Sequence, residues 1–283
     1  MSNQCMTGIE RIRVELEKTG YPLELRCNRL FRNQEWFTLD HPYYLDADEN
    51  KGREIDAFIL KNFVQENDKK VFNLNIALSV EIKKSASKPW VVLTDDSSGS
   101  PPESVIHATL ARLHIQEIWF RELLDNHHLK RFKRTGRSAC QAYLSGQESE
   151  FNDKKKANDP SRNHQTFNAF VSCFKAASEL QKHQQGQNNQ DLWTKESKKS
   201  YFCGISHGLV VVQGGLYEAY IDSYGEMIIE EKSHIPYIFN YVSEKYAYKS
   251  LLVDIVHFDN LELYLSDYTS WGNECAKWGL SQL

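Results

Sequence analysis

Apolar and polar residues alternate along much of the first hundred residues, which predicts short β-strands. The segments REIDAFILK (53–61) and VFNLNIALSVEIKK (71–84) combine this alternation with many β-branched residues. The polar stretch QENDKK between them is a turn signal. Residues 36–48 are aromatic and β-prone, and KPWVVL (88–93) is a further short apolar run. The pattern therefore predicts a hairpin with strands before and after it.

Apolar residues recur at helical spacing in other parts of the chain. The expected helices cover 8–19, about 22–33 with Pro22 at its start, 103–134, 166–185 and the closing segment LELYLSDYTSWGNECAKW. YFCGISHGLVVVQGGLYEAYID predicts strand, turn and strand, and SLLVDIVHF (250–258) predicts one more strand. Strands interleaved with helices are typical of an α/β or α+β sheet protein.

Composition and charge narrow the class of protein. The chain has 283 residues, of which 41% are hydrophobic and 25% charged, enough to bury a sizeable core. No apolar run approaches the roughly 18 residues of a membrane span, and no apolar h-region marks a secretory signal. Six scattered cysteines without a C-x-x-C pair favour reduced thiols in a cytoplasmic protein. A net charge of −4 gives no global attraction for nucleic acid, so such a partner requires a local basic face.

The second strand of the hairpin has two different faces. Alternate side chains of a strand point to opposite faces, so the odd positions 77–83 place Glu81 and Lys83 on one face, roughly 7 Å apart. The opposite face carries only apolar residues: Leu74, Ile76, Leu78, Val80 and Ile82. We therefore expect the apolar face to pack on the core and to hold the charged pair rigidly on the other side.

An antiparallel register that pairs Asp56 with Glu81 centres the turn between Asp68 and Lys69, inside QENDKK. This register brings the two carboxylates within about 5 Å at Cβ, where they repel each other. Such a pair usually needs a cation, and oxygen ligands without Cys or His suit Mg²⁺ or Mn²⁺. A lysine beside the cation can orient an attacking water and stabilise a charged phosphorane.

REID followed by VEIKKS-x-x-KPWVV resembles the restriction-endonuclease-like nuclease superfamily, whose signature is PD-(D/E)XK, and in particular a branch of uncharacterised bacterial and defence-associated nucleases. Asp56 matches the first acidic position, and Glu81 and Lys83 match the second half. Glu24, in YPLELRCNRLF, matches a glutamate that the family often adds on the preceding helix. Ile55 stands where the signature has proline. The resemblance covers about residues 20–94.

The resemblance implies a restriction-endonuclease-like α/β fold, with a four-stranded mixed sheet flanked by helices, in one domain. Its core would comprise about residues 20–94 and 166–280, with an inserted helical segment and polar linker at about 95–165. It implies Mg²⁺-dependent cleavage of phosphodiester bonds, in DNA more than in RNA, by a protein that often forms a homodimer. Asp56, Glu81 and the Ile82 backbone carbonyl would bind the metal, Lys83 would activate water, and Glu24 would act as an outer or second-metal carboxylate.

Two alternatives to an active nuclease remain open. E-x-K also occurs at Glu196-Ser197-Lys198 and Glu230-Glu231-Lys232, so the tripeptide alone is a weak signal, and the charges at 81–83 can simply mark a solvated strand end. The fold can also serve as a silent module that binds nucleic acid or a protein.

Other motifs support further, weaker hypotheses. Gly204-Ile205-Ser206-His207-Gly208 matches the G-x-S-x-G elbow of acyl hydrolases, with Asp254 and His257 as partners, but that motif needs a helix after its turn. Cys203 and His207 have metal-ligand spacing without a second pair. The basic cluster HHLKRFKRTGR (127–137) could contact a nucleic-acid backbone.

Overall fold

The computed structural model describes residues 7–85, 88–96, 110–113, 134–141, 165–186, 198–246 and 249–283. Within these ranges the helices are α1 (Gly8–Lys18), α2 (Tyr21–Asn33), α5 (Gln165–Gly186), the short 3-10 helix η4 (Phe258–Asn260) and α6 (Leu261–Ser281). Thr7 caps α1 through a reciprocal pair of hydrogen bonds with Glu10. Pro22 lies in the first turn of α2, where its missing N–H has no helical partner to lose.

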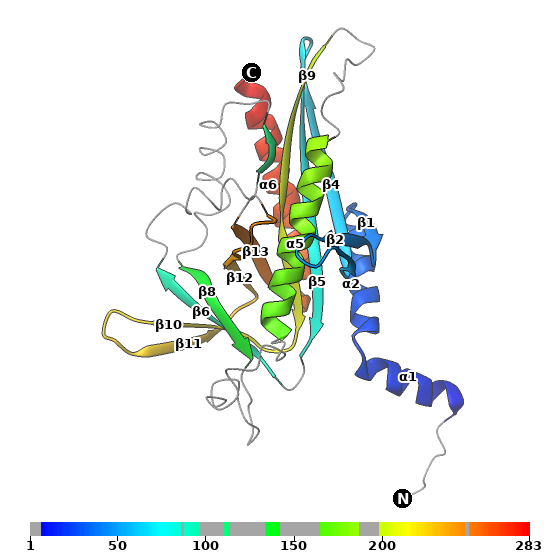
Figure 1. Cartoon of the computed structure of the whole chain (residues 1–283), viewed down its shortest axis with the longest axis vertical. Coiled ribbons are helices and arrows are strands. Elements are labelled where there is room, and N and C mark those ends of the chain that lie inside the picture. Colours follow the sequence, from blue (N-terminus) through cyan, green and yellow to red (C-terminus); the bar gives the residue numbers. More distant parts are fainter. Residues whose placement is uncertain are drawn as a thin grey trace, which may run out of the picture.

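The strands join into one mixed eleven-stranded sheet and a separate hairpin (Figure 1). The hairpin consists of β2 (Tyr43–Asp46) and β3 (Lys51–Glu54). The sheet order is β1-β4-β5-β9-β13-β12-β8-β6-β10-β11, and β7 pairs with β9 beside this path. Its strands are β1 (Phe37–Asp40), β4 (Ala57–Glu66), β5 (Lys70–Lys84), β6 (Trp90–Asp96), β7 (Leu110–Leu113), β8 (Arg134–Gln141), β9 (Lys199–Gln213), β10 (Leu216–Ile221), β11 (Met227–Glu231), β12 (His234–Asn240) and β13 (Ser250–His257).

Helices cover both faces of the sheet around β5. The apolar residues of β5 from Leu74 to Ile82 pack with α2 and α6 in one buried cluster. On the other face α5 crosses β5 and β9, and the Ser79 hydroxyl donates a hydrogen bond to the Cys173 carbonyl of α5, at 2.9 Å. Figure 1 shows β5 and β9 side by side along their length, between α5 and α6. Because both faces are covered, Glu81 of β5 is buried in the protein interior.

Close backbone approach fixes α6 on the sheet. A Cβ at Gly272 would lie 2.5 Å from the Phe63 ring of β4, and one at Gly279 would lie 2.4 Å from the Phe72 ring of β5. Both distances are far below van der Waals contact, so only glycine lets the two phenyl rings pack directly against the helix backbone. The two rings and their glycines therefore set the position of α6 over β4 and β5.

Most predicted elements agree with the structure. The helices near 8–19, 22–33 and 166–185, the closing helix, the hairpin strand at 71–84 and the strand at 250–258 are all present. The single strand expected over 53–61 is instead divided between β3 and β4 at Ile55 and Asp56. This interruption ends the β2–β3 hairpin and places Asp56 immediately before the first residue of β4.

The inserted segment differs from expectation. The long helix predicted over 103–134 is wrong at Leu110–Leu113, which form β7 and pair with β9, and at Arg134, where β8 begins. Tertiary pairing with β9 overrides the helical spacing of the apolar residues there. The rest of that prediction, and residues 127–133 of the basic cluster, lie outside the described residues. The sheet is also larger than the four strands that the resemblance implied.

None of the helices in the described ranges is both long enough and apolar enough to cross a membrane.

Candidate functional site

The register of the β4–β5 hairpin places Asp56 beside Glu81. Ala57 pairs with Val80 at one end of the ladder and Glu66 with Val71 at the other. The same register, continued by one residue past Ala57, sets Asp56 opposite Glu81, as predicted from the position of the turn. The predicted register is thus confirmed, and both acidic residues lie at the end of the hairpin where β4 begins and where β5 continues to Lys84 in parallel pairing with β9.

The Asp56 carboxylate holds the end of β5. Its Oδ2 accepts a hydrogen bond from the Ile82 backbone N–H at 2.6 Å and lies 3.3 Å from the Lys83 ammonium. Lys83 Nζ also contacts Glu81 Oε2 directly. One ammonium group is therefore shared by two carboxylates that would otherwise repel each other.

Burial strongly affects the pKa values of the charged groups in this cluster of Asp56, Glu81 and Lys83. Glu81 is only 5% exposed, and this burial raises the pKa of its carboxyl above the ordinary value, with Lys83 opposing the rise and Asp56 adding to it. Burial alone would lower the pKa of Lys83, but its ion pairs with Glu81 and Asp56 outweigh burial and raise that pKa. The nearby Ser172 of α5 also opposes the rise in the pKa of Glu81. The site thus concentrates negative charge where water is largely excluded.

Glu81 makes the metal-free protein less stable as the pH rises. Folding raises the pKa of the Glu81 carboxyl above the ordinary value of 4.5. At a pH between the unfolded and the folded pKa, the folded state binds more protons than the unfolded state, so stability falls as the pH increases. In a chelating buffer, the melting temperature of Glu81→Gln minus that of the unaltered protein should therefore increase as the pH rises from about 4.5 to neutrality. Thermal unfolding at several pH values measures this difference, and a difference that shrinks with pH would contradict the burial of an ionised Glu81.

Glu24 reaches the same region from α2. Its side chain is 15% exposed and its Oε2 lies 3.6 Å from His41 Nε2. Burial raises the pKa of Glu24, and the nearby Asp56 charge raises it further, while His41 and Lys83 lower it. Glu24 therefore lies within electrostatic range of Asp56 and Lys83, so the structure brings all four predicted side chains to one end of the β4–β5 hairpin.

The donor set suits a hard cation. Among the described residues, no group of three or more His, Cys, Asp and Glu side chains is close enough together to hold a metal ion. Mg²⁺, however, commonly uses one or two carboxylates and keeps several waters, and Asp56 and Glu81 supply two. The Ile82 N–H points toward Asp56, and a strand residue directs its N–H and C=O to the same side. The Ile82 carbonyl is therefore directed toward this edge as well.

Sequence reasoning missed His41. Its backbone N–H donates to the Asp56 carbonyl at 3.1 Å, and its ring lies between Glu24 and Glu54, with Nδ1 3.0 Å from Glu54 Oε1. The available signal was a histidine next to a proline, in a turn between two aromatic β-prone segments. Only the fold shows that this turn meets the start of β4.

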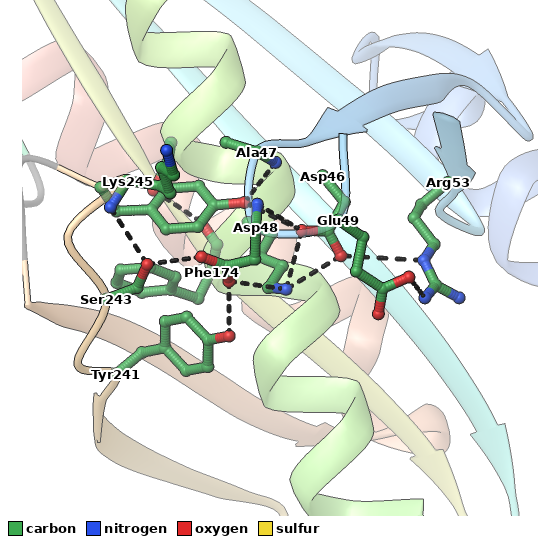
Figure 2. Close-up of polar contacts among 12 residues, drawn as sticks. Asp46, Ala47, Asp48, Glu49, Arg53, Phe174, Tyr241, Ser243 and Lys245 are labelled. Atoms are coloured by element: carbon green, nitrogen blue, oxygen red, sulfur yellow. Dashed lines mark hydrogen bonds and ion pairs between the residues drawn. The ribbon is translucent and has the colours of Figure 1, made fainter. Parts of the chain in front are cut away.

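A second polar cluster fastens the tip of the β2–β3 hairpin (Figure 2). Lys175 of α5 lies 2.8 and 2.9 Å from the two carboxylate oxygens of Asp46 and 2.9 Å from Asp48 Oδ2. Tyr241 and Ser243 donate hydrogen bonds to Asp48 from the loop after β12. Since every charge in this cluster has partners, we assign it a structural role: it ties the hairpin beside the site to α5.

The acyl-hydrolase hypothesis is contradicted. Ser206 lies in the middle of β9 with a fully buried side chain, paired with Ala77 of β5, so no elbow and no following helix exist. The Asp254 carboxylate is bound by His234 and Tyr264, and the His257 ring accepts a hydrogen bond from the Asp259 N–H at the start of η4. Cys203 and His207 join no metal-binding group among the described residues.

The lysines of the other two E-x-K tripeptides lie outside the β4–β5 hairpin. Lys198 pairs with Glu66 at an exposed position, and Lys232 pairs with Glu218 and Glu230 near the β10–β11 edge of the sheet. Trp90 is fully buried in the core and has no surface for stacking on a base.

Comparisons with family models, with curated proteins and with solved structures returned no match.

Proposed function

We propose that the protein is a Mg²⁺-dependent nuclease that cleaves phosphodiester bonds, with DNA as its preferred substrate. The observation that carries the proposal is the pair of carboxylates, Asp56 and Glu81, that face one lysine at the end of a buried hairpin. The mixed sheet with helices on both faces is compatible with the restriction-endonuclease-like fold that the sequence resembles. The proposal rests on the chemistry of these side chains. Two carboxylates can bind a metal ion, and a lysine ammonium can donate hydrogen bonds to the reacting phosphate, as metal-dependent phosphodiester hydrolysis requires.

Each side chain has a definite part in this reaction. When bound, the metal neutralises phosphate charge and lowers the pKa of a coordinated water. Asp56 and Glu81 would bind it, and the Ile82 carbonyl would complete the protein ligands. Lys83, displaced from between the carboxylates, would orient the attacking water and donate a hydrogen bond to the charged phosphorane. Glu24 would hold the outer waters from the α2 side.

A cleavage assay tests the proposal. Supercoiled plasmid and single-stranded DNA are incubated with the full chain in Mg²⁺ and, in parallel, with a chelator. We expect cleavage in Mg²⁺ that the chelator abolishes, and a weaker effect on RNA. Absence of cleavage of every substrate, at millimolar Mg²⁺ or Mn²⁺, would contradict the proposal.

Asp56→Asn should weaken Mn²⁺ binding at least ~100-fold, because the amide removes one anionic ligand and leaves a neutral oxygen. Isothermal titration of the purified full chain with Mn²⁺ measures the affinity. Asp259→Asn is the matched control, because Asp259 is 81% exposed at its side chain and lies near His257, outside the site. Equal Mn²⁺ affinities for Asp56→Asn and the unaltered protein would remove Asp56 from the site.

A silent module that binds nucleic acid or a protein is the second candidate. One observation favours it: Lys83 already neutralises both carboxylates, so a metal ion must displace an ion pair to enter. The same Mn²⁺ titration separates the two functions. No heat of binding at millimolar Mn²⁺, together with retained binding to DNA, would favour the silent module.

A further inference from the structure

His41 has an unusual backbone for its position. Its φ is +49°, in the left-handed region that side-chain-bearing residues rarely adopt, and the next residue is Pro42. Asn50, at the tip of the β2–β3 hairpin that follows His41, also has a positive φ, of +51°. Asn tolerates this conformation well, and a turn at a hairpin tip requires it. Histidine adopts a positive φ more readily than most residues, and the contacts of His41 hold it there.

The contacts of His41 connect three segments that meet at the site. The backbone N–H donates a hydrogen bond to the Asp56 carbonyl at 3.1 Å. Ring atom Nδ1 lies 3.0 Å from Glu54 Oε1, and Nε2 lies 3.6 Å from Glu24 Oε2. Since an ionised carboxylate only accepts hydrogen bonds, both ring nitrogens face acceptors. His41 therefore contacts α2 through Glu24, the end of β3 through Glu54, and the residue before β4 through the Asp56 carbonyl.

A partner such as His41 favours the ionised form of the Glu24 carboxyl. Burial and the Asp56 charge both work against an ionised Glu24, and Glu54 adds a smaller repulsion. His41 and Lys83 oppose these effects by attraction. Lys83 is already shared by Asp56 and Glu81, whereas His41 Nε2 lies beside Glu24 Oε2 at 3.6 Å.

We infer that His41 is a positioning residue that holds the Glu24 carboxylate toward Asp56 and so completes the metal site from the α2 side. This inference rests on the proposed function and adds to it a residue that the nuclease signature does not contain. His41 acts through Glu24 and through the Asp56 backbone, and it has no direct role at the scissile phosphate. Groups around a metal ligand typically change metal affinity or activity 10- to 100-fold when they are removed.

His41→Gly provides the test, because glycine adopts a positive φ freely and keeps the backbone hydrogen bond to Asp56 while the ring is lost. Asn50→Gly is the matched control, at the tip of the β2–β3 hairpin, where φ is also positive. We expect His41→Gly to weaken Mn²⁺ binding about tenfold and to lower the Mg²⁺-dependent cleavage rate at saturating DNA by a similar factor. We expect Asn50→Gly to change neither. Thermal unfolding of both variants checks that they remain folded.

A double-mutant cycle with Glu24→Gln shows whether His41 acts through Glu24. In the Glu24→Gln background, His41→Gly should cost no further Mn²⁺ affinity. An equal tenfold loss in both backgrounds, or no loss in either, would overturn the inference. If the unaltered protein neither binds Mn²⁺ nor cleaves DNA, the proposed function fails and the inference falls with it. Failure of the inference alone leaves the unaltered protein active and His41→Gly equal to it.

Discussion

Lys83→Ala is expected to lower Mg²⁺-dependent DNA cleavage by roughly 100-fold or more at saturating substrate. The Lys83 ammonium is the only cation that the structure places against both Asp56 and Glu81 among the described residues. A positioned donor that stabilises charge developing in a transition state is worth about 10²–10³ in rate, and proton transfer by a positioned group adds a comparable factor. The loss should appear in kcat, because Lys83 acts on the reacting groups rather than on substrate binding.

The Mn²⁺ affinity of Lys83→Ala should not fall together with its cleavage rate. Without Lys83, no ammonium competes for the space between the two carboxylates, so Mn²⁺ affinity should be retained or increased while cleavage is lost. Lys232→Ala is the matched control, since Lys232 closes another E-x-K tripeptide and also lies between two glutamates, 3.2 Å from Glu218 and 2.6 Å from Glu230. Cleavage by Lys83→Ala at the rate of Lys232→Ala would remove Lys83 from the catalytic site.

Lys175→Met is expected to destabilise the folded protein by about 3 kcal/mol, because it removes the ammonium that pairs with both Asp46 and Asp48. Asp46 is 3% exposed, so its carboxylate cannot regain water. Burial by itself would lower the pKa of Lys175, yet its hydrogen bonds to Asp46 and Asp48 raise that pKa, and the same hydrogen bonds would be lost in the variant. For a chain of this size, the melting temperature should fall by ~6 °C or more.

An exposed ion pair gives the comparison for this effect. Lys18 pairs with Glu15 on α1, where both side chains are more than 60% exposed, and such pairs contribute at most about 1 kcal/mol. Lys18→Met should therefore shift the melting temperature by no more than ~2 °C. Urea or thermal unfolding of the two variants measures the difference, and equal shifts would show that the Lys175 cluster does not hold the hairpin to α5.

The β4–β5 hairpin that carries the site could be predicted because neighbouring residues in the sequence determine its turn and its strand pairing. The polar turn around Asp68 and the alternation in 71–84 together fix the register, and the register places Asp56 opposite Glu81. The apolar face of β5 packs as expected because strand periodicity determines it. Glu24 was found by resemblance alone, since nothing in α2 distinguishes a glutamate directed at a site from one in solvent.

The remainder depends on long-range pairing that the sequence pattern does not encode. Leu110–Leu113 have helical spacing but pair with β9, and β6 lies between β8 and β10 although its pattern predicts only a short strand. Full burial of Glu81 also could not be predicted, because it requires α5 to cross the charged face of β5. His41 was missed for a related reason: its partners Glu24, Glu54 and Asp56 come together only when three segments meet.

A crystal structure of the full chain soaked in Mn²⁺, with anomalous diffraction at the manganese edge, tests most directly whether Asp56 and Glu81 share a cation. We expect one anomalous peak between the two carboxylates, at metal–oxygen distances of about 2.0–2.2 Å, with the Lys83 ammonium displaced from its present contacts. A site with no anomalous peak at millimolar Mn²⁺, and with Lys83 still bound to both Asp56 and Glu81, would contradict metal binding by this pair of carboxylates.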